Sequence, residues 1–550
     1  MNKRLPTISL PRWLAIAAIV LLAVIAYHNC LHNEMFWDDD DFITKNRYIK
    51  DWHYFPNFFS ENLVAGGYLL SNYWRPVLLT VFAFAWHAWG SWLPGWHSLN
   101  ISFHALDGIL LYLLFNRLFA TPVLSLAVGL LFVVHPTHNE AIVYVNSLGD
   151  SLATFFVLSS LLLFVRFRQS FKPSYASRNF WFALLFFPLA VMSKETGFVL
   201  CGLLPTMDLL LIQKNDSFLA RVKKTLLTAW PFLALAIVYI LLRATVLNFN
   251  NSFNFYNEQN EFSSHIFIRL LTFFKAMTQY AGFLFCPYQL RVERQMPWAH
   301  SLMEWDVLLG GAFVTLMVIS IFKYWRSKPI ISFGFAWFFI AIAPASNVLV
   351  PINAVLYEHF LYMPMIGILV VVCFLALNHI EQKNLYKISI ICFIIILVVF
   401  SAINIRRNLD WRTSIGFYEQ LVKYAPSYRV INNLGMEYAN KGRNDKAEYW
   451  YNKAIAMDPK NPVAYHNIAG TYRDTGRLQL AEANFKKAIA LNPNFIFSYR
   501  SLADLYYRMG NYPEAKKYLI VLVHFDPQDQ NAKNALQQVD GLINRAPSPI

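Results

Sequence analysis

The sequence predicts an all-α protein with two parts, a polytopic membrane domain and a following solenoid of helical repeats. Hydrophobic residues make up 56% of its 550 residues, whereas a soluble domain has about 45–50%. The excess lies in blocks such as WLAIAAIVLLAVIAY and ISIICFIIILVVF, and a bilayer needs about 20 such residues per span. After residue 405 the chain becomes polar and repeats itself. These observations together predict membrane helices first and soluble helices second.

Apolar blocks predict about eleven membrane spans in residues 1–405. They lie near 13–29, 98–115, 121–134, 150–166, 179–193, 197–213, 224–243, 304–322, 329–345, 361–377 and 386–404. The first block follows Lys3 and Arg4 as a secretory signal would, but HNCLHNEM is a poor cleavage site, so we expect an uncleaved span. The aromatic stretches 75–92 and 266–285 are interrupted, and we expect interfacial or re-entrant helices there.

Basic loops alternate with the spans and set the expected orientation. MNKRLPTISLPR, RFRQSFKPSYASR, KNDSFLARVKK, KYWRSKPI and NHIEQKNLYK fall on one side, which the positive-inside rule makes cytoplasmic. The net charge of +14 is therefore explained by topology, and no nucleic-acid partner is expected. The five cysteines are scattered and indicate neither a disulfide framework nor a metal cluster.

The tail repeats with a period of 34 residues. Corresponding positions carry tyrosine, glycine, alanine and proline: Tyr438, Tyr472 and Tyr506; Gly442, Gly476 and Gly510; Ala447, Ala481 and Ala515; Pro459, Pro493 and Pro527. This is the tetratricopeptide-repeat signature, typical of a superhelix that binds polypeptide, although a spacer or scaffold is the alternative. The expected order is a membrane domain at 1–405, a linker helix at 406–427, three repeats at 428–529, and a capping helix and tail at 530–550.

Four adjacent carboxylates, Asp38, Asp39, Asp40 and Asp41, follow the first span. Apolar neighbours on both sides predict that the run is held against the membrane surface rather than free in solvent. Poor solvation and mutual repulsion should raise at least one carboxyl pKa. Such a site suits a general base, or alternatively a divalent cation held at Asp38–Asp41. A solvated loop is the simpler alternative.

Further polar clusters gather on the same predicted face. His97, Asn100 and His104 form one helical stripe; a buried hydrogen-bond network is the alternative to a site. His135, His138, Glu140 and Asp150 surround a proline-broken hairpin, and Arg75, Lys194, Glu195, Glu358, His359 and Tyr362 lie at span ends. The cations could hold a lipid phosphate or pair with nearby acids. No metal ligands are assigned among these residues.

The motifs WDD with Asn46, YWRP, WHSLNISFHA, HPTHNEA, SKETG and YEHFLYMP occur in an order that resembles the transmembrane and tetratricopeptide repeat protein O-mannosyltransferases. The resemblance implies a GT-C membrane fold and a polyprenyl-phosphate sugar donor. It also implies that Asp38 and Asp39 match the family's acidic pair, Glu140 the acid after the His-Pro turn, and Arg75 the arginine before proline. One departure is Ser147, Leu148 and Gly149 before Asp150, where relatives often carry an arginine.

The resulting hypothesis is a glycosyltransferase that moves one sugar from a polyprenyl monophosphate to Ser or Thr of an exported protein. Asp38 or Asp39 would take the acceptor proton, with Glu140 assisting. Arg75, Lys194 and His359 would meet the donor phosphate. Supporting polar roles are expected for Asp40, His97, Asn100, His104, His135, His138, Asp150, Glu195, Glu358 and Tyr362. The repeats would bind the acceptor protein.

Other functions remain alternatives. The enzyme could act on a lipid or glycan acceptor or transfer a whole oligosaccharide, and the chain could instead be a non-enzymatic envelope scaffold that recruits partners through its repeats. A transporter fits less well, because the polar clusters gather at one surface rather than at the bilayer midplane. We expect a bacterial inner-membrane protein with a cytoplasmic N-terminus and periplasmic repeats, the endoplasmic reticulum with lumenal repeats being the alternative.

Overall fold

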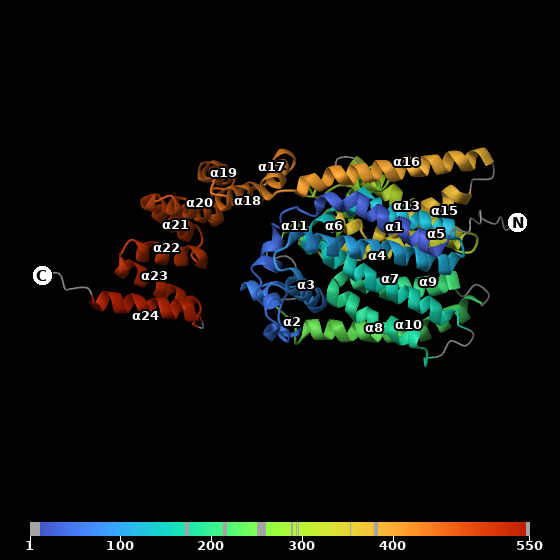
Figure 1. The fold of residues 1–550 in the computed structure, drawn as a ribbon, viewed down its shortest axis with the longest axis horizontal. Coiled ribbons are helices and arrows are strands. Elements are labelled where there is room, and N and C mark those ends of the chain that lie inside the picture. The colour runs from blue at the N-terminus through green and yellow to red at the C-terminus, as the bar shows by residue number, and fades with distance from the viewer. Residues whose placement is uncertain are drawn as a thin grey trace. The chain divides into compact units, whose positions relative to one another are not determined.

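The computed structural model describes residues 11–170, 175–212, 217–249, 260–287, 290–292, 294, 296–352, 354–378, 383–527 and 529–545. Parts of the predicted basic loops (1–10, 171–174, 213–216 and 379–382) and the end of the predicted tail (546–550) lie outside them. The structure is 79% helical, and its described residues contain no strand (Figure 1). The chain divides into two compact units, Met1–Thr413 and Ser414–Ile550.

Long apolar helices build the first unit. By length and composition, seven segments among the described residues could each cross a membrane, or eight if the bent pair α5 and α6 counts as one span. Their main helices are α1 (Arg12–Tyr27), α4 (Leu93–Phe119), α5 (Pro122–Val134) with α6 (Asn139–Val143), α7 (Leu148–Arg168), α9 (Leu200–Met207), α10 (Phe218–Ala244), α13 (Trp305–Tyr324) and α16 (Lys383–Asn408). Shorter apolar helices are α3 (Pro76–Trp89), α8 (Arg178–Ser193), α14 (Pro329–Ile342) and α15 (Pro364–Asn378). The predicted all-α polytopic fold is confirmed, and the count of about eleven spans stays a prediction.

Two close helix crossings depend on glycine. Gly108 of α4 faces Gly129 of α5, and a Cβ added to Gly129 would lie 3.0 Å from the Gly108 carbonyl oxygen. Gly334 of α14 meets Gly367 of α15, where an added Cβ would lie 2.2 Å from the Gly334 carbonyl oxygen. Small residues let membrane helices approach backbone to backbone. The first crossing fixes α4 against the helix that leads into the His-Pro turn.

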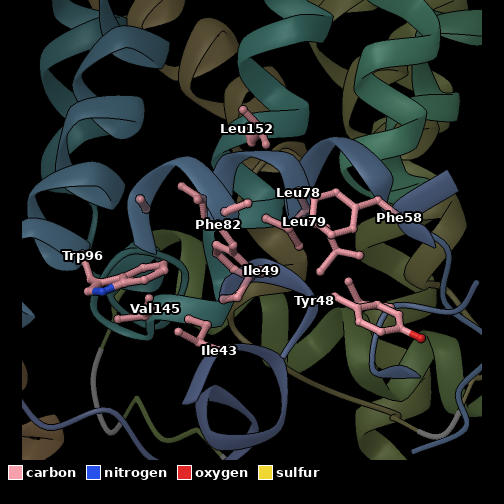
Figure 2. Close-up of a cluster of buried hydrophobic side chains, with 14 residues drawn as sticks. Ile43, Tyr48, Ile49, Phe58, Leu78, Leu79, Phe82, Trp96, Val145 and Leu152 are labelled. Atoms are coloured by element: carbon pink, nitrogen blue, oxygen red, sulfur yellow. The ribbon is translucent and has the colours of Figure 1, made fainter. Parts of the chain in front are cut away.

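The loop between α1 and α4 folds over one end of the helix bundle. It carries α2 (Asn57–Ser60) and α3, and its apolar side chains join those at the start of α7 in one core (Figure 2). Ile43, directly after the acidic run, packs in this core with Val145 and Leu148. The acidic run is therefore held by burial of its flanking residues. The predicted interfacial stretches form α3 and α12 (Ile266–Phe285), and the short helix α11 (Glu261–Ser264) precedes α12. The structure contains no bilayer, so the interfacial position of α3 and α12 stays a prediction.

The second unit is a row of helix pairs. It contains α17 (Ser414–Tyr424), α18 (Tyr428–Asn440), α19 (Asn444–Met457), α20 (Pro462–Asp474), α21 (Leu478–Leu491), α22 (Ile496–Arg508), α23 (Tyr512–Phe525) and α24 (Gln530–Arg545). The turn glycines Gly442, Gly476 and Gly510 have φ of 70°, 77° and 74°, the left-handed region that glycine enters at least cost. The three periodic alanines are fully buried where paired helices cross. The periodic residues thus have the roles that the repeat predicted.

Candidate active site

Asp39 is the buried member of the acidic run, at 2% exposure. Its Oδ1 accepts a hydrogen bond of 2.8 Å from the backbone N–H of Asn146. Burial raises the pKa of Asp39 well above its usual value; the Asn146 hydrogen bond opposes this, and the adjacent charge of Asp38 adds to it. The predicted perturbation of a carboxyl in this run is confirmed. A raised carboxyl pKa is a common property of general bases, so Asp39 is the member of the run that best fits this role.

The backbone directly before the acidic run is strained and is held in place by aromatic contacts and a hydrogen bond. Trp37 has φ of 63°, a left-handed conformation that is uncommon for a bulky residue and is found mostly where surrounding contacts impose it. Its ring stacks on Tyr144 at 5.5 Å between centroids, and Tyr144 stacks on Trp411 at 5.5 Å. The Tyr144 hydroxyl also accepts a hydrogen bond from the Asp38 N–H. The acidic run is therefore fastened to the segment between α6 and α7.

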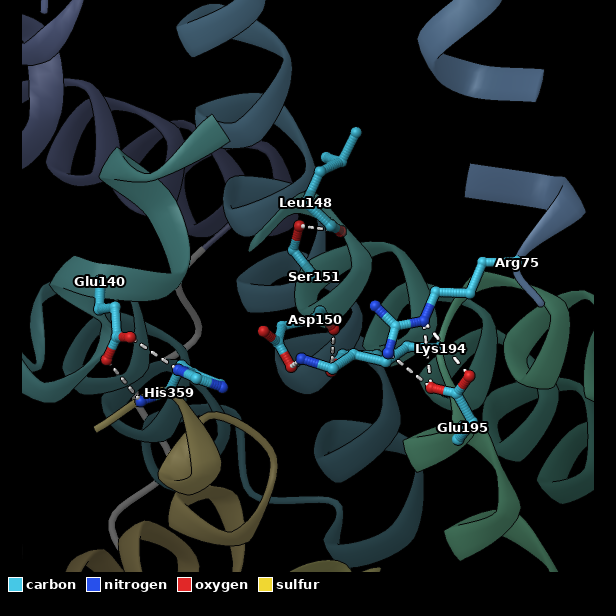
Figure 3. Close-up of polar contacts among 9 residues, drawn as sticks. Arg75, Glu140, Leu148, Asp150, Ser151, Lys194, Glu195 and His359 are labelled. Atoms are coloured by element: carbon cyan, nitrogen blue, oxygen red, sulfur yellow. Dashed lines mark hydrogen bonds and ion pairs between the residues drawn. The ribbon is translucent and has the colours of Figure 1, made fainter. Parts of the chain in front are cut away.

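Two acid–cation pairs and one acid–histidine pair lie near this segment (Figure 3). They are Arg75 with Glu195 at 2.7 Å, Lys194 with Asp150 at 2.7 Å, and His359 Nδ1 with Glu140 at 2.8 Å. The Glu140 carboxylate also accepts from the His359 backbone N–H at 3.2 Å. In the view of Figure 3 the Asp150–Lys194 pair lies between the other two. Pairing with nearby acids, the alternative that the sequence left open for these cations, is the arrangement observed.

The pairs share their electrostatic surroundings with the acidic run. Burial raises the pKa of Tyr73, Arg75 opposes the shift, and the charges of Glu195 and Asp38 add to it. Tyr73 also lies under the Arg75 guanidinium, 4.5 Å from ring centroid to Cζ. Asp38 and the Arg75–Glu195 pair therefore both influence the Tyr73 hydroxyl. The structure thus gathers Asp38, Asp39, Arg75, Glu140, Asp150, Lys194, Glu195 and His359 around one end of the bundle.

Glu358 forms a buried network that the sequence predicted only in part. Its carboxylate contacts Arg407 of α16 at 2.8 Å and Arg294 at 3.7 Å. Burial raises the pKa of Glu358 to about 7, although Arg407 opposes the shift. Sequence reasoning missed Arg407. The sequence does carry a signal for this residue, since Asn404, Arg407 and Asn408 form a polar stripe on one face of the last span. In the structure all three bond to the segment around the His-Pro turn or its neighbours.

The predicted histidine stripe proves to be a buried hydrogen-bond network. Asn100 donates to the carbonyl oxygens of Ile142 and Tyr144, and His97 contacts that of Asn33. The remaining stripe and hairpin histidines bond similarly: His104 to Tyr362 and Val133, His135 to Thr137 and Leu284, and His138 to Phe132. The alternative of a structural network fits these contacts. These residues hold the hairpin that carries Glu140.

Asp40 and Asp41 are less buried than Asp39 and share a lysine partner. Both lie near the Lys45 ammonium, at 3.6 Å and 3.8 Å, and both are partly exposed. In the part of the chain that the structure describes, no three His, Cys, Asp or Glu side chains form a group suited to a metal ion. The four aspartates therefore do not converge as ligands, and a cation at Asp38–Asp41 stays a prediction.

The fold and site define a polytopic membrane protein with an acid- and cation-rich end and a repeat unit. Family models described as tetratricopeptide repeat match residues 428–461, 450–483 and 473–539. Among solved structures, the first TPR of Spaghetti (RPAP3) bound to an HSP90 peptide is 26% identical over 21% of this chain and 93% of its own, with a TM-score of 0.21. MamA is 21% identical over 26% of this chain and 85% of its own, with a TM-score of 0.23.

Curated relatives cover both units. Protein O-mannosyl-transferase TMTC4 of Homo sapiens is 25% identical over 81% of this chain and 67% of its own length. Protein O-mannosyl-transferase F38B6.6 of Caenorhabditis elegans is 24% identical, covering 80% and 62%, and tmtc2 of Xenopus laevis is 24% identical, covering 79% and 61%. The chain thus spans about two thirds of the length of these relatives. The resemblance to this group is confirmed.

Proposed function

We propose that the chain transfers one sugar, mannose by similarity to its relatives, from a polyprenyl monophosphate to Ser or Thr hydroxyls of exported proteins. The observation that carries the proposal is the cluster described above. Two cations and a histidine, each paired with an acid, lie near a strained loop that presents a buried aspartate. Sugar transfer from a glycosyl phosphate needs both kinds of group. The basic side chains stabilise the negative charge that develops on the leaving phosphate, and the aspartate accepts the proton that the acceptor loses.

The basic members of the three pairs retain some access to solvent. Side-chain exposure is 12% for Arg75, 16% for Lys194 and 18% for His359. A donor phosphate could therefore share these cations with Glu195, Asp150 and Glu140 by short charge-assisted hydrogen bonds. Asp39 takes the acceptor proton in this scheme, with Asp38 beside it, and Glu140 orients His359. The lipid tail of the donor lies between the spans.

The proposed reaction takes place on the extracytoplasmic face. Helix α7 supports this orientation, because Asp150 lies in its first turn and Arg166 and Arg168 in its last. At 1.5 Å per residue, Asp150 and Arg168 are about 27 Å apart along the axis, close to the thickness of a hydrocarbon core. The basic end then lies in the cytoplasm by the positive-inside rule. We propose a bacterial inner membrane, with periplasmic repeats that bind the acceptor polypeptide.

No divalent cation is required in this scheme, because a monophosphate donor carries less charge than a diphosphate. Purified protein should transfer sugar at an unchanged rate in excess chelator. Loss of activity in chelator with recovery on addition of Mg²⁺ or Mn²⁺ would show that a metal ion belongs to the reaction.

Reconstitution tests the activity itself. The full chain in lipid vesicles would receive polyprenyl-phosphate mannose and an exported acceptor protein, and mass spectrometry should find one added hexose on Ser or Thr. A parallel reaction with nucleotide-linked mannose is the donor control and should give no product. Transfer only from the nucleotide sugar, or only to lipid or glycan, would contradict the proposal.

A further inference from the structure

A buried chain of side chains links α4 to the segment that carries His359. The Tyr362 hydroxyl oxygen lies 2.8 Å from Asp107 Oδ2 and 2.8 Å from His104 Nδ1. On its other side, His104 Nε2 lies 3.1 Å from the Val133 carbonyl oxygen. All four residues are essentially inaccessible to solvent. Sequence analysis singled out His104 and Tyr362 but not Asp107.

Counting hydrogens constrains this chain. A carbonyl oxygen only accepts, so His104 Nε2 carries a hydrogen, and in a neutral imidazole Nδ1 is then an acceptor. The single hydrogen of Tyr362 must therefore point to His104. The short contact between Tyr362 and Asp107 then needs a hydrogen from Asp107. In the only other assignment, His104 is an imidazolium that donates to Tyr362, Tyr362 donates to Asp107, and Asp107 is a carboxylate.

The surroundings of Asp107 favour the uncharged assignment. Its second oxygen, Oδ1, is buried and has no hydrogen-bond partner among the described residues. A carboxylate would leave one of its two charged oxygens without a donor, which is more costly than burying the carbonyl of a carboxylic acid. No ion pair described in the structure includes Asp107.

We propose that Asp107 is a positioning residue that stays protonated and donates a hydrogen bond to the Tyr362 hydroxyl oxygen. The Tyr362 hydroxyl in turn donates to His104, and His104 donates to Val133. Since Asp107 touches neither of the proposed reacting groups, it acts through the residues that it ties. A directed chain of this kind has one low-energy arrangement, because each hydroxyl or ring nitrogen has a single hydrogen to place.

The hydrogen-bond chain contacts both segments that carry the Glu140–His359 pair. Val133 lies in the last turn of α5, just before the His-Pro turn that carries Glu140, and Tyr362 follows His359 by three residues. Close contact of Gly108 with Gly129 holds α4 at the distance that the chain requires. Asp107 therefore fixes the turn of Glu140 and the turn of His359 against one helix. This consequence for catalysis rests on the proposed function, whereas the hydrogen-bond chain itself does not.

Four variants of the full chain test the inference. Asp107→Asn keeps an N–H donor for Tyr362 and should retain near-normal transfer, whereas Asp107→Leu removes the donor. Tyr362→Phe removes the central hydroxyl and tests the chain even where Asp107→Leu fails to fold. Both disruptive variants should lower kcat/KM by about tenfold to a hundredfold, the loss expected when reacting groups shift by about 1 Å. Tyr27→Phe is the control, since the Tyr27 ring contacts His104 at 5.5 Å while its buried hydroxyl has no partner among the described residues.

Thermal unfolding of the same purified proteins gives a readout that needs no activity. Asp107→Leu and Tyr362→Phe should each lower the midpoint, and combining them should add little, because both break one chain. Asp107→Asn and Tyr27→Phe should leave it nearly unchanged. An Asp107→Asn protein as impaired as Asp107→Leu would overturn the proposal in favour of a charged pair, and additive losses would also overturn it. If the wild-type protein transfers no sugar, the proposed function fails and the unfolding measurements alone decide the inference.

Discussion

The membrane unit and the repeat unit place their charged side chains in opposite ways. In the membrane unit the pairs Arg407–Glu358 and Arg168–Asp208 are buried, with distances of 2.8 Å and 2.7 Å. In the repeat unit, three pairs join residues three or four positions apart on exposed helix surfaces: Lys486–Glu482, Arg508–Asp504 and Lys517–Glu514. Exposed pairs contribute little to stability, whereas breaking a buried pair leaves an uncompensated charge. Charge should therefore matter for folding and chemistry in the first unit, and backbone geometry should matter more in the second.

The largest expected effect is loss of activity at the acidic run. Asp39→Asn keeps an oxygen that can accept from the Asn146 N–H, so the loop should stay folded. It removes the proposed base, and general-base catalysis typically contributes about 10²–10⁴-fold. Initial rates of sugar transfer by the reconstituted variant measure the loss.

Two neighbouring variants complete this experiment. Asp41→Asn changes a partly exposed aspartate paired with Lys45 and should keep nearly full activity. Asp38→Asn tests whether the partly buried neighbour shares the role. If Asp38→Asn and Asp39→Asn are both folded, inserted and fully active, the assignment of the base to this run is wrong.

The next effect concerns stability in the membrane unit. Arg407→Met leaves Glu358 buried without its nearest partner, and such a loss costs about 3–5 kcal/mol. Arg406→Met is the matched control from the adjacent position, because Arg406 is 67% exposed and pairs with Asp410 four residues further on; it should cost about 0–1 kcal/mol. Denaturant unfolding of both purified variants gives the difference. Equal losses would mean that burial of the pair has no energetic consequence.

A smaller effect should appear as a pH dependence of stability. Burial raises the pKa of Glu358 from 4.5 to about 7, so between these values the folded state binds more protons than the unfolded state. Stability should therefore fall as pH rises from about 4.5 to about 7, by about 3 kcal/mol in total. Glu358→Gln cannot ionise and should remove this slope from the measured unfolding curves. A wild-type slope that persists unchanged in Glu358→Gln would assign the effect to another group.

The two units also differ in how much their sequences predicted. In the repeats, a period of 34 places glycine, alanine and tyrosine in fixed local roles, so the turns and helix crossings followed from the sequence. In the membrane unit, hydropathy located the apolar helices because desolvation selects apolar residues wherever a span lies. The kinds of residue at the site were also predictable, since polar groups at span ends stand out against an apolar background.

The pairing of those residues was not predictable. Arg75 bonds Glu195 across 120 residues, and His359 bonds Glu140 across 219. Helix packing decides such contacts, and nothing within one segment encodes them. Asp107 and Arg407 were missed for a related reason: a charge in an apolar helix indicates a buried polar contact, but its partner, here Tyr362 or Glu358, lies in a distant segment of the chain.

The smallest expected effect tests backbone geometry in the repeat unit. Gly476 has φ of +77°, whereas Gly470 is helical and has open space around an added Cβ. Gly476→Ala should therefore cost about 1 kcal/mol, because a Cβ is disfavoured in the left-handed region. Gly470→Ala should stabilise by up to about 1 kcal/mol through helix propensity. Pulse proteolysis of the purified chain in increasing urea would follow cleavage within the repeats. Opposite shifts would support the contrast between the units, and the same shift for both would show that packing of the repeats, rather than backbone conformation, sets their stability.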